Sequence, residues 1–401
     1  MLNFLTPIIS FVLTIITSMS MAFAPLTEEV VKKNFDYAAS FDQVAYENQL
    51  VPTEDADGWV FTTDRDFKVV QLTDIHIGGG LMSIEKDQKA MNAVAAMLTY
   101  EKPDLVVLTG DMVYPVPFQA GTFNNQISIR MLITLLEKLG VYYAPIFGNH
   151  DAEAYSTNNR EQVADMWGAD NLKYSLFKKG PADVDGFGNY IIKVKGTDGR
   201  VNNALYLIDS HDYNEGDLLG ISGDYDRIHD NQIEWYKNSV NAIDSANNDG
   251  DKIFSSYAFF HIPLQEYDAA WKEYAANGYK DTENVKYIDG GYHETDEKVC
   301  CSSHPENFFE TILDLGSTKA TFCGHDHVNN AILEYKGVQL VYGMSIDYLA
   351  YIDPVTADMG PQRGCTVITM ESDGDFDVSL ENYYQDKYES KYEKESVSMG
   401  W

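Results

Sequence analysis

The chain has 401 residues, of which 44% are hydrophobic, and it contains 27 Tyr and 19 Phe. This composition is typical of a globular protein and excludes a disordered one. The chain carries 62 acidic and 29 basic residues, a formal net charge of −33, and it has no long basic run that could neutralise a series of phosphates. Nucleic-acid binding is therefore not expected.

Residues 1–24 carry no charged side chain and contain an apolar stretch that ends in small residues, with Ala22-Phe23-Ala24 as a candidate cleavage site. We expect a cleaved signal peptide, a secreted or endomembrane-lumenal location, and no membrane association after cleavage. Two features speak against a typical leader: the first lysine is Lys32, and Pro25 directly follows the candidate site. A membrane anchor over residues 2–24 and a buried helix are the alternatives.

Residues 25–64 form a polar, acidic segment that we expect to link the leader to the first strong strand, 67–72. Short apolar, β-rich runs then recur, each followed by a polar loop, and such runs are typical of buried strands. These runs cover residues 105–108, 142–147, 253–260 and 320–323. Amphipathic helices are predicted between them at 85–100 and 127–139. The alternation favours a layered α/β fold with a largely parallel core.

The last third of the chain has a different pattern. Residues 331–335, 338–342, 365–370 and 376–380 are predicted to form consecutive antiparallel strands. The predicted fold is therefore an α/β two-sheet sandwich flanked by helices, with one domain over residues 65–381. Residues 382–401 are charged and rich in Tyr, and we expect a solvated tail.

Five loops that follow predicted strands each carry side chains able to bind a metal ion, at the end of the sheet where open α/β folds place ligands. They are Asp74-Ile75-His76, Gly110-Asp111, Gly148-Asn149-His150-Asp151, His261, and Gly324-His325-Asp326-His327. Carboxylate, amide and imidazole groups suit divalent transition metals. Alternate residues of an extended segment point the same way, so both members of Asp-x-His and of His-x-His can face one cavity. A carboxylate placed between two ions can bridge them.

In this order, the five blocks resemble the calcineurin-like metallophosphoesterases, and the resemblance covers roughly residues 65–381. Local context in 259–263, 324–329, and 221–223 near Tyr225-Asp226 resembles the branch of probable inactive purple acid phosphatases. The word "inactive" in that name refers to departures from the purple acid phosphatase ligand set. It does not carry over to a chain whose Asp74-x-His76 block is complete.

The resemblance implies a role for each matching residue. Asp74, His76 and His327 would hold one metal ion, Asn149, His261 and His325 a second ion, and Asp111 would bridge the two. The ions would be divalent or of mixed valence, drawn from Fe, Mn, Zn and Co. A hydroxide between them would attack phosphorus. His150 would protonate or stabilise the leaving group, and Asp151 would orient His150.

The implied function is metal-dependent hydrolysis of phosphate esters, with phosphomonoesters favoured over phosphodiesters. A protein that binds metal but has lost turnover, and acts in binding or regulation, is the alternative from another class. His150 argues against that alternative, because a purely structural metal site needs no proton donor. The partner that we expect is the phosphate-ester substrate.

Several other residues invite a functional interpretation. Tyr114 matches the Gly-Asp-x-x-Tyr pattern of purple acid phosphatases, in which Tyr binds ferric iron. His76 already fills that coordination position, so we expect Tyr114 to line the pocket or to be a packing residue. His211, in Asp209-Ser210-His211, either faces the substrate or makes ordinary loop hydrogen bonds. Residues 78–80, all glycine, are expected to form a flexible loop beside the metals, since they lack the Lys of a phosphate-binding loop. The four cysteines either pair in one of three ways or are free thiols; they are Cys300, Cys301, Cys323 and Cys365.

Overall fold

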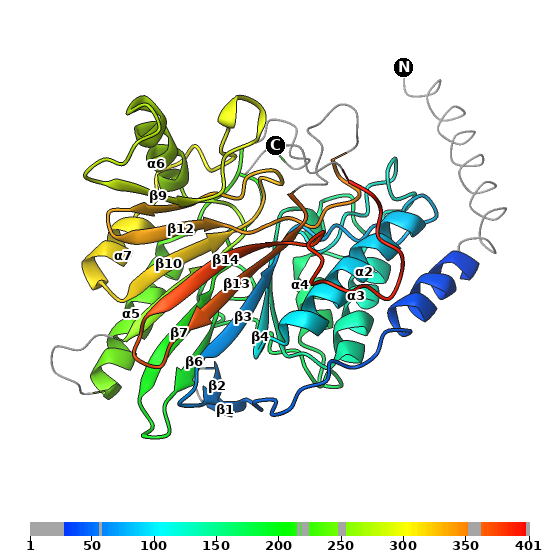
Figure 1. Cartoon of the computed structure of the whole chain (residues 1–401), viewed down its shortest axis with the longest axis horizontal. Helices are drawn as coiled ribbons and strands as arrows, with labels where there is room; N and C mark the ends of the chain where they lie inside the picture. Colours follow the sequence, from blue (N-terminus) through cyan, green and yellow to red (C-terminus); the bar gives the residue numbers. More distant parts are fainter. Residues whose placement is uncertain are drawn as a thin grey trace, which may run out of the picture.

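A computed structural model describes residues 28–55, 58–214, 217, 224–247, 254–351 and 362–397 (Figure 1). The predicted signal peptide, residues 1–24, and the family-like residues 221–223 lie outside these ranges, so the leader, its alternatives and the location that they imply stay predictions. Across the ranges that are described, no helix combines the length and the apolar character needed to cross a bilayer.

Two sheets form the centre of the fold. The smaller sheet has five strands, in the order β14 (Phe376–Asn382), β13 (Gly364–Met370), β3 (Phe67–Leu72), β4 (Leu105–Thr109) and β5 (Tyr143–Ile146). The larger sheet has nine, in the order β1 (Thr53–Asp55), β2 (Gly58–Thr62), β6 (Tyr190–Lys195), β7 (Val201–Leu207), β8 (Ser255–Phe259), β10 (Thr318–Cys323), β12 (Val338–Tyr342), β11 (Ile332–Tyr335) and β9 (Val285–Asp289). Every residue of β4 and of β8 is buried, because sheet and helix cover both of their faces.

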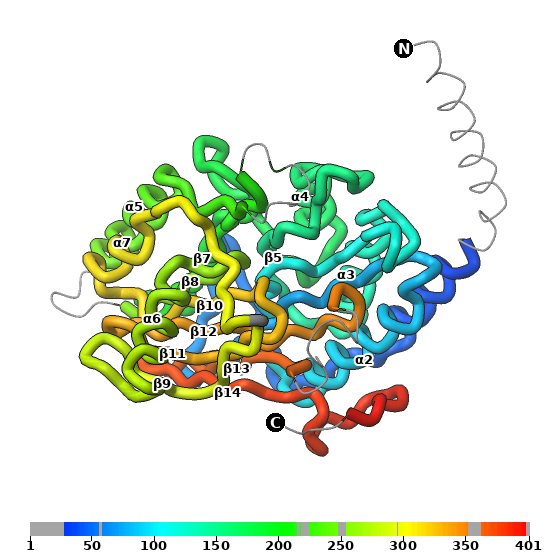
Figure 2. The backbone as a smooth tube through the Cα atoms, turned by 90° about the horizontal axis from the view of Figure 1, so that it is seen from above, coloured from blue at the N-terminus to red at the C-terminus, as the bar shows by residue number. Residues whose placement is uncertain are grey.

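Helices cover the outer faces of both sheets, which confirms the predicted α/β sandwich. Figure 2 shows α2 (Ile84–Glu101) and α3 (Asn125–Leu139) on one side of the strands, and α5 (Asp230–Asn247), α6 (Gln265–Ala276) and α7 (Phe308–Leu315) on the other. The short α4 (Arg160–Trp167) packs against α3. The predicted helices 85–100 and 127–139 are confirmed to within two residues at each end.

The four strands predicted in the last third of the chain all form, but their arrangement differs from the expected consecutive set. β11 and β12 make one antiparallel hairpin in the larger sheet, and β13 and β14 make another in the smaller sheet. β12 also pairs in parallel with β10. The chain therefore changes sheets after Tyr342, and this crossing carries Asp347 past the ends of the strands.

Both terminal segments pack against the domain. Residues 28–38 are helical, and Phe41 and Val44 are buried. In the tail, which runs beside α2 in Figure 2, Tyr383 and Tyr388 are each only 1% exposed. The rings of these two tyrosines therefore anchor the predicted tail to the domain, because they supply apolar surface that packs against it. The other described residues of the tail, up to 397, are partly or fully exposed, as expected of a solvated segment.

Candidate metal centre

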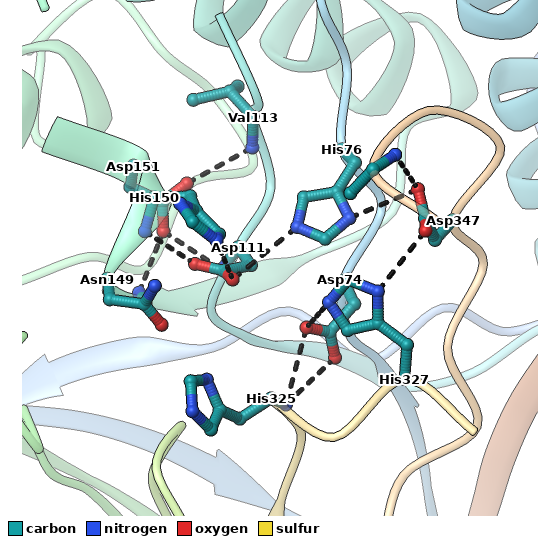
Figure 3. A network of polar contacts seen from close by, with 12 residues as sticks. Asp74, His76, Asp111, Val113, Asn149, His150, Asp151, His325, His327 and Asp347 are labelled. Atoms are coloured by element: carbon teal, nitrogen blue, oxygen red, sulfur yellow. Dashed lines mark hydrogen bonds and ion pairs between the residues drawn. The ribbon is translucent and has the colours of Figure 1, made fainter. Parts of the chain in front are cut away.

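The five predicted loops meet at the carboxyl ends of strands from both sheets. Figure 3 labels residues from all of these loops except the one that carries His261. β3 leads into Asp74 and His76, β4 into Asp111, and β5 into Asn149 and His150. β8 of the larger sheet leads into His261, and β10 leads into His325 and His327. The structure thus brings all seven predicted metal ligands together, in two groups that share Asp111.

Asp74, His76, Asp111 and His327 form the first group; all four are buried, and their ligand atoms lie within 4.8 Å of one another. His76 Nε2 lies 3.4 Å from Asp111 Oδ2, and His327 Nε2 lies 3.4 Å from Asp74 Oδ1. The opposite ring nitrogens face Asp347: the Nδ1 atoms of His76 and His327 lie 3.2 Å from its Oδ1 and Oδ2. Asp347 therefore turns both Nε2 atoms toward the ion site.

Asp111, His261 and His325 form the second group, which is also buried. His261 Nδ1 lies 2.8 Å from the carbonyl oxygen of Thr109, to which it donates, so its Nε2 is free for a metal. That Nε2 lies 3.3 Å from Asp111 Oδ2, 3.3 Å from His325 Nδ1 and 3.2 Å from Asn149 Oδ1. The amide oxygen of Asn149 thus points into the second group, and Asp111 Oδ2 faces both groups, as a bridging carboxylate must.

The electrostatics of these residues suit a cation. Burial raises the pKa of Asp111, but the neighbouring His261 and His150 rings hold the pKa well below its usual range. Burial lowers the pKa of His325, the nearby His261 lowers it further, and this ring is therefore neutral, with a lone pair to donate. Nε2 of His325 is buried without a hydrogen-bond partner. Burial lowers the pKa of His261, but Asp111 raises it to about 9, so a dication bound here would displace a proton from this ring. A buried set of carboxylates and imidazoles fits divalent ions of the kind the sequence predicts.

The backbone around the groups is strained and tightly packed. Asp74, His76, Asp111 and His325 have φ angles of 49°, 56°, 53° and 76°, a left-handed conformation that costs energy for residues with a side chain and is concentrated at functional sites. A Cβ atom on Gly148 would lie 2.1 Å from Asp111 Oδ1, and one on Gly324 would lie 1.9 Å from Thr73 Oγ1. Only glycine allows these loops to approach the carboxylates so closely.

His150 lies at the edge of the centre, with its Nε2 4.0 Å from Asp111 Oδ2 and its side chain 25% exposed. Asp151 was predicted to orient His150, but its carboxylate makes other hydrogen bonds. The Asp151 carboxylate accepts the backbone N–H groups of Gly148, Asp111 and Val113 at 2.8, 3.0 and 3.2 Å (Figure 3). Glu153 contacts His150 instead, with Oε1 2.7 Å from Nδ1.

The local turn explains this correction. Residues 150–152 form a 3-10 turn, in which residues three apart lie on the same side. Glu153 therefore comes beside His150, while Asp151 faces the loop that holds Asp111. Sequence analysis did not reveal Glu153 and Asp347, which contact predicted site residues but belong to no motif. The only available signal for Asp347 was its position just after a predicted strand.

The other residues considered from sequence lie around the centre. The Tyr114 ring packs edge-on against His76 and His150, at centroid distances of 5.1 and 4.9 Å, as a wall residue would. Gly78 and Gly79 donate their backbone N–H groups to the buried Asp87 at 2.7 and 3.0 Å, so the expected flexible loop is tied down. All four cysteines are free thiols, one of the two alternatives left open.

Residues 67–329, more than half of the chain, match the Calcineurin-like phosphoesterase family, and the chain belongs to this family. Probable inactive purple acid phosphatase 29 of Arabidopsis thaliana is 29% identical over 315 residues, which cover 73% of this chain and 74% of that protein. Phosphatase DCR2 of Saccharomyces cerevisiae is 31% identical over 299 residues, which cover 68% of this chain and 46% of that protein. A dimetal phosphatase structure from Danio rerio aligns at 12% identity with a TM-score of 0.47, over 80% of this chain and 98% of that one.

Proposed function

We propose that this metallophosphoesterase hydrolyses phosphate esters at a dinuclear centre, with phosphomonoesters as the favoured substrates. One observation carries the proposal: Asp111 Oδ2 lies 3.4 Å from His76 Nε2 in one buried group and 3.3 Å from His261 Nε2 in the other. A single oxygen placed in this way can be shared by two ions.

Two ions bound there would act as Lewis acids toward the phosphoryl oxygens and would lower the pKa of a bound water. The protein's own residues hold the centre in place: Asp347 fixes the tautomer of His327, and the Thr109 carbonyl fixes that of His261. Asp347 Oδ1 also lies 3.2 Å from Nδ1 of His76. His150 is the side chain placed to serve the leaving group. Its Nδ1 donates to Glu153, which leaves Nε2 facing the centre, 4.0 Å from Asp111 Oδ2. When the ring carries both protons, Nε2 is the position from which one can pass to the leaving group.

The His150–Glu153 pair also supports turnover over a role in binding alone. A structural metal site needs its ligands, but it does not need a partly exposed imidazole held in a fixed orientation by a buried carboxylate. The Arabidopsis relatives carry the word "inactive" in their names, whereas the yeast relative is named a phosphatase. The preference for monoesters rests on the word phosphatase in these names, and phosphodiester cleavage at the same centre is the second candidate.

Assays of purified protein with p-nitrophenyl phosphate and with bis-p-nitrophenyl phosphate separate three candidate functions. These are hydrolysis of phosphomonoesters, hydrolysis of phosphodiesters, and metal binding without turnover. The proposal predicts turnover of both at the same centre, with the higher kcat/KM on the monoester. A higher kcat/KM on the diester would make the protein a phosphodiesterase. No turnover of either ester by protein that holds both metal ions would favour the binding or regulatory role.

A further inference from the structure

An exposed apolar patch lies beside the dinuclear centre, and the chemistry proposed above does not use it. The patch consists of four large side chains, Leu81, Met82, Phe118 and Phe123, which are 39%, 61%, 89% and 53% exposed. They are four of the nine exposed large hydrophobic residues in the described part of the chain. Exposed apolar side chains that gather in one place are typical of a binding site.

The patch and its surroundings are formed by three segments that lead away from residues of the centre. They are residues 77–84 after His76, residues 112–124 after Asp111, and residues 154–159 shortly after His150. None of these segments carries a charged side chain, although 23% of the chain is charged. A neutral surface next to a site for phosphate indicates that the rest of the ligand is neutral as well.

Contacts between the three segments join them into one surface. A Cβ atom on Gly121 would lie only 3.0 Å from Cγ of Met82, so the Met82 side chain lies directly over the second segment. The backbone N–H of Thr157 donates to the carbonyl of Phe123 at 3.0 Å. The ring of Phe123 also meets that of Tyr155 at a centroid distance of 6.2 Å. Tyr155 thus extends the patch across the third segment.

Two tyrosine rings connect the patch to the side of the centre where His150 lies. Tyr114, in the second segment, packs edge-on against His150 at a centroid distance of 4.9 Å. Burial raises the pKa of Tyr155, and the carboxylates of Glu153 and Asp111 raise it further, so the Tyr155 hydroxyl lies near the centre. Because His150 is the proposed proton donor, the group that it protonates leaves on this side of the centre.

We propose that the apolar patch binds the leaving group of the substrate, and that the preferred substrates are phosphomonoesters of uncharged, apolar alcohols or phenols. This inference rests on the proposed function and names its class of substrate. An alkyl chain or aromatic ring laid over Met82 and Phe123 would remove apolar surface from water, and each methylene so buried raises affinity by up to about fourfold. A charged leaving group would lose hydration there without meeting an opposite charge.

Two series of ligands that differ only in the leaving group test this inference. Propyl, hexyl and 6-aminohexyl phosphate release alcohols of similar basicity, so their kcat/KM values compare binding rather than chemistry. Metal-loaded wild-type protein should hydrolyse hexyl phosphate with a kcat/KM roughly 10-fold above those of the other two. Butylphosphonate and heptylphosphonate carry CH₂ in place of the ester oxygen of propyl and hexyl phosphate and cannot be hydrolysed. Calorimetry should show the same preference in their Kd values.

A variant of the patch and a matched variant elsewhere locate the effect. Phe123→Ser should reduce the preference for the longer chain roughly 3-fold or more, because it removes a ring that the chain would cover. Val51→Ser should keep the wild-type preference. Val51 is 70% exposed and lies near the far end of α3 from the patch, where the Gln49 side chain donates to the carbonyl of Gly140 at 2.7 Å.

The two series also separate this inference from the proposed function. Phosphonate affinities that do not depend on chain length, or a preference that Phe123→Ser leaves intact, would overturn the inference and leave the proposed function standing. Tighter binding of heptylphosphonate without turnover of any ester would support the patch and contradict the proposed function. A dimer that Phe123→Ser dissociates would assign the patch to a second copy of this chain, and binding to phosphatidylcholine vesicles that Phe123→Ser abolishes would assign it to a lipid surface. Either result would overturn the inference.

Discussion

The Glu153 carboxylate contacts Nδ1 of His150 at 2.7 Å, and the same oxygen accepts the Tyr213 hydroxyl at 3.1 Å. Tyr213 in turn accepts from Asn149 Nδ2 at 2.9 Å. One buried carboxylate thus orients the proposed proton donor and, through Tyr213, the amide whose oxygen faces the second ion site. Glu153 is a positioning residue, because it acts through His150 and Asn149.

Replacing Glu153 by Gln keeps its size and removes its charge. We expect kcat to fall roughly 10- to 100-fold, the usual effect of losing an orienting contact behind a functional group. The loss should be larger for an alkyl phosphate than for p-nitrophenyl phosphate, whose leaving group scarcely needs a proton. Equal losses on both esters, with both ions still bound, would show that Glu153 does not act through His150.

His150→Ala should leave both ions bound and lower kcat by roughly 10²–10⁴ on an alkyl phosphate, the usual contribution of a positioned proton donor. The fall should be smaller on an aryl phosphate. Asp111→Ala, the comparison variant, should lose metal and activity together, since it removes the bridge. An unchanged kcat for His150→Ala on both esters would remove His150 from the mechanism, and loss of metal would identify it as a ligand.

Asp347→Asn tests the contact behind His76 and His327. An amide offers one oxygen acceptor, whereas two imidazole Nδ1 groups face the two carboxylate oxygens. We expect affinity for the first ion to fall roughly 10- to 100-fold, measured by competition with a chromogenic chelator. Asp87→Asn, at a buried carboxyl that contacts no predicted ligand side chain, is the matched control and should bind both ions normally. Equal affinities in the two variants would contradict this role.

Asp87 should make stability depend on pH. Burial raises its pKa from 3.8 to about 7, despite hydrogen bonds from Gly78, Gly79 and Ser83 that act the other way. The folded state therefore binds this proton more tightly than the unfolded chain does, and the stabilisation is complete below pH 4 and lost as pH rises toward 7. The free energy of unfolding of the wild type, relative to Asp87→Asn, should fall over this range in urea titrations. A rise would contradict the burial argument.

Much of the centre could be predicted because its ligands lie in short loops after strongly apolar strands, a local pattern that the sequence displays directly. Glu153 and Asp347 could not be predicted in this way, because their contacts depend on a 3-10 turn and on a crossing between sheets. Asp151 shows the same limit, since adjacency to His150 in sequence did not produce a contact. The prediction of a solvated tail rested on the charge of this segment. It missed the rings of Tyr383 and Tyr388, which are buried and hold the tail against the domain.

Turnover of p-nitrophenyl phosphate before and after metal removal tests the proposed dinuclear mechanism most directly. Six ligands and a bridging carboxylate are proposed to hold two ions that the chemistry needs, so protein stripped by a chelator should lose all activity. Activity should return when Mn, Zn, Fe or Co is added, and should not return in stripped Asp111→Ala. Full activity in protein shown by elemental analysis to be free of metal would contradict the dinuclear mechanism.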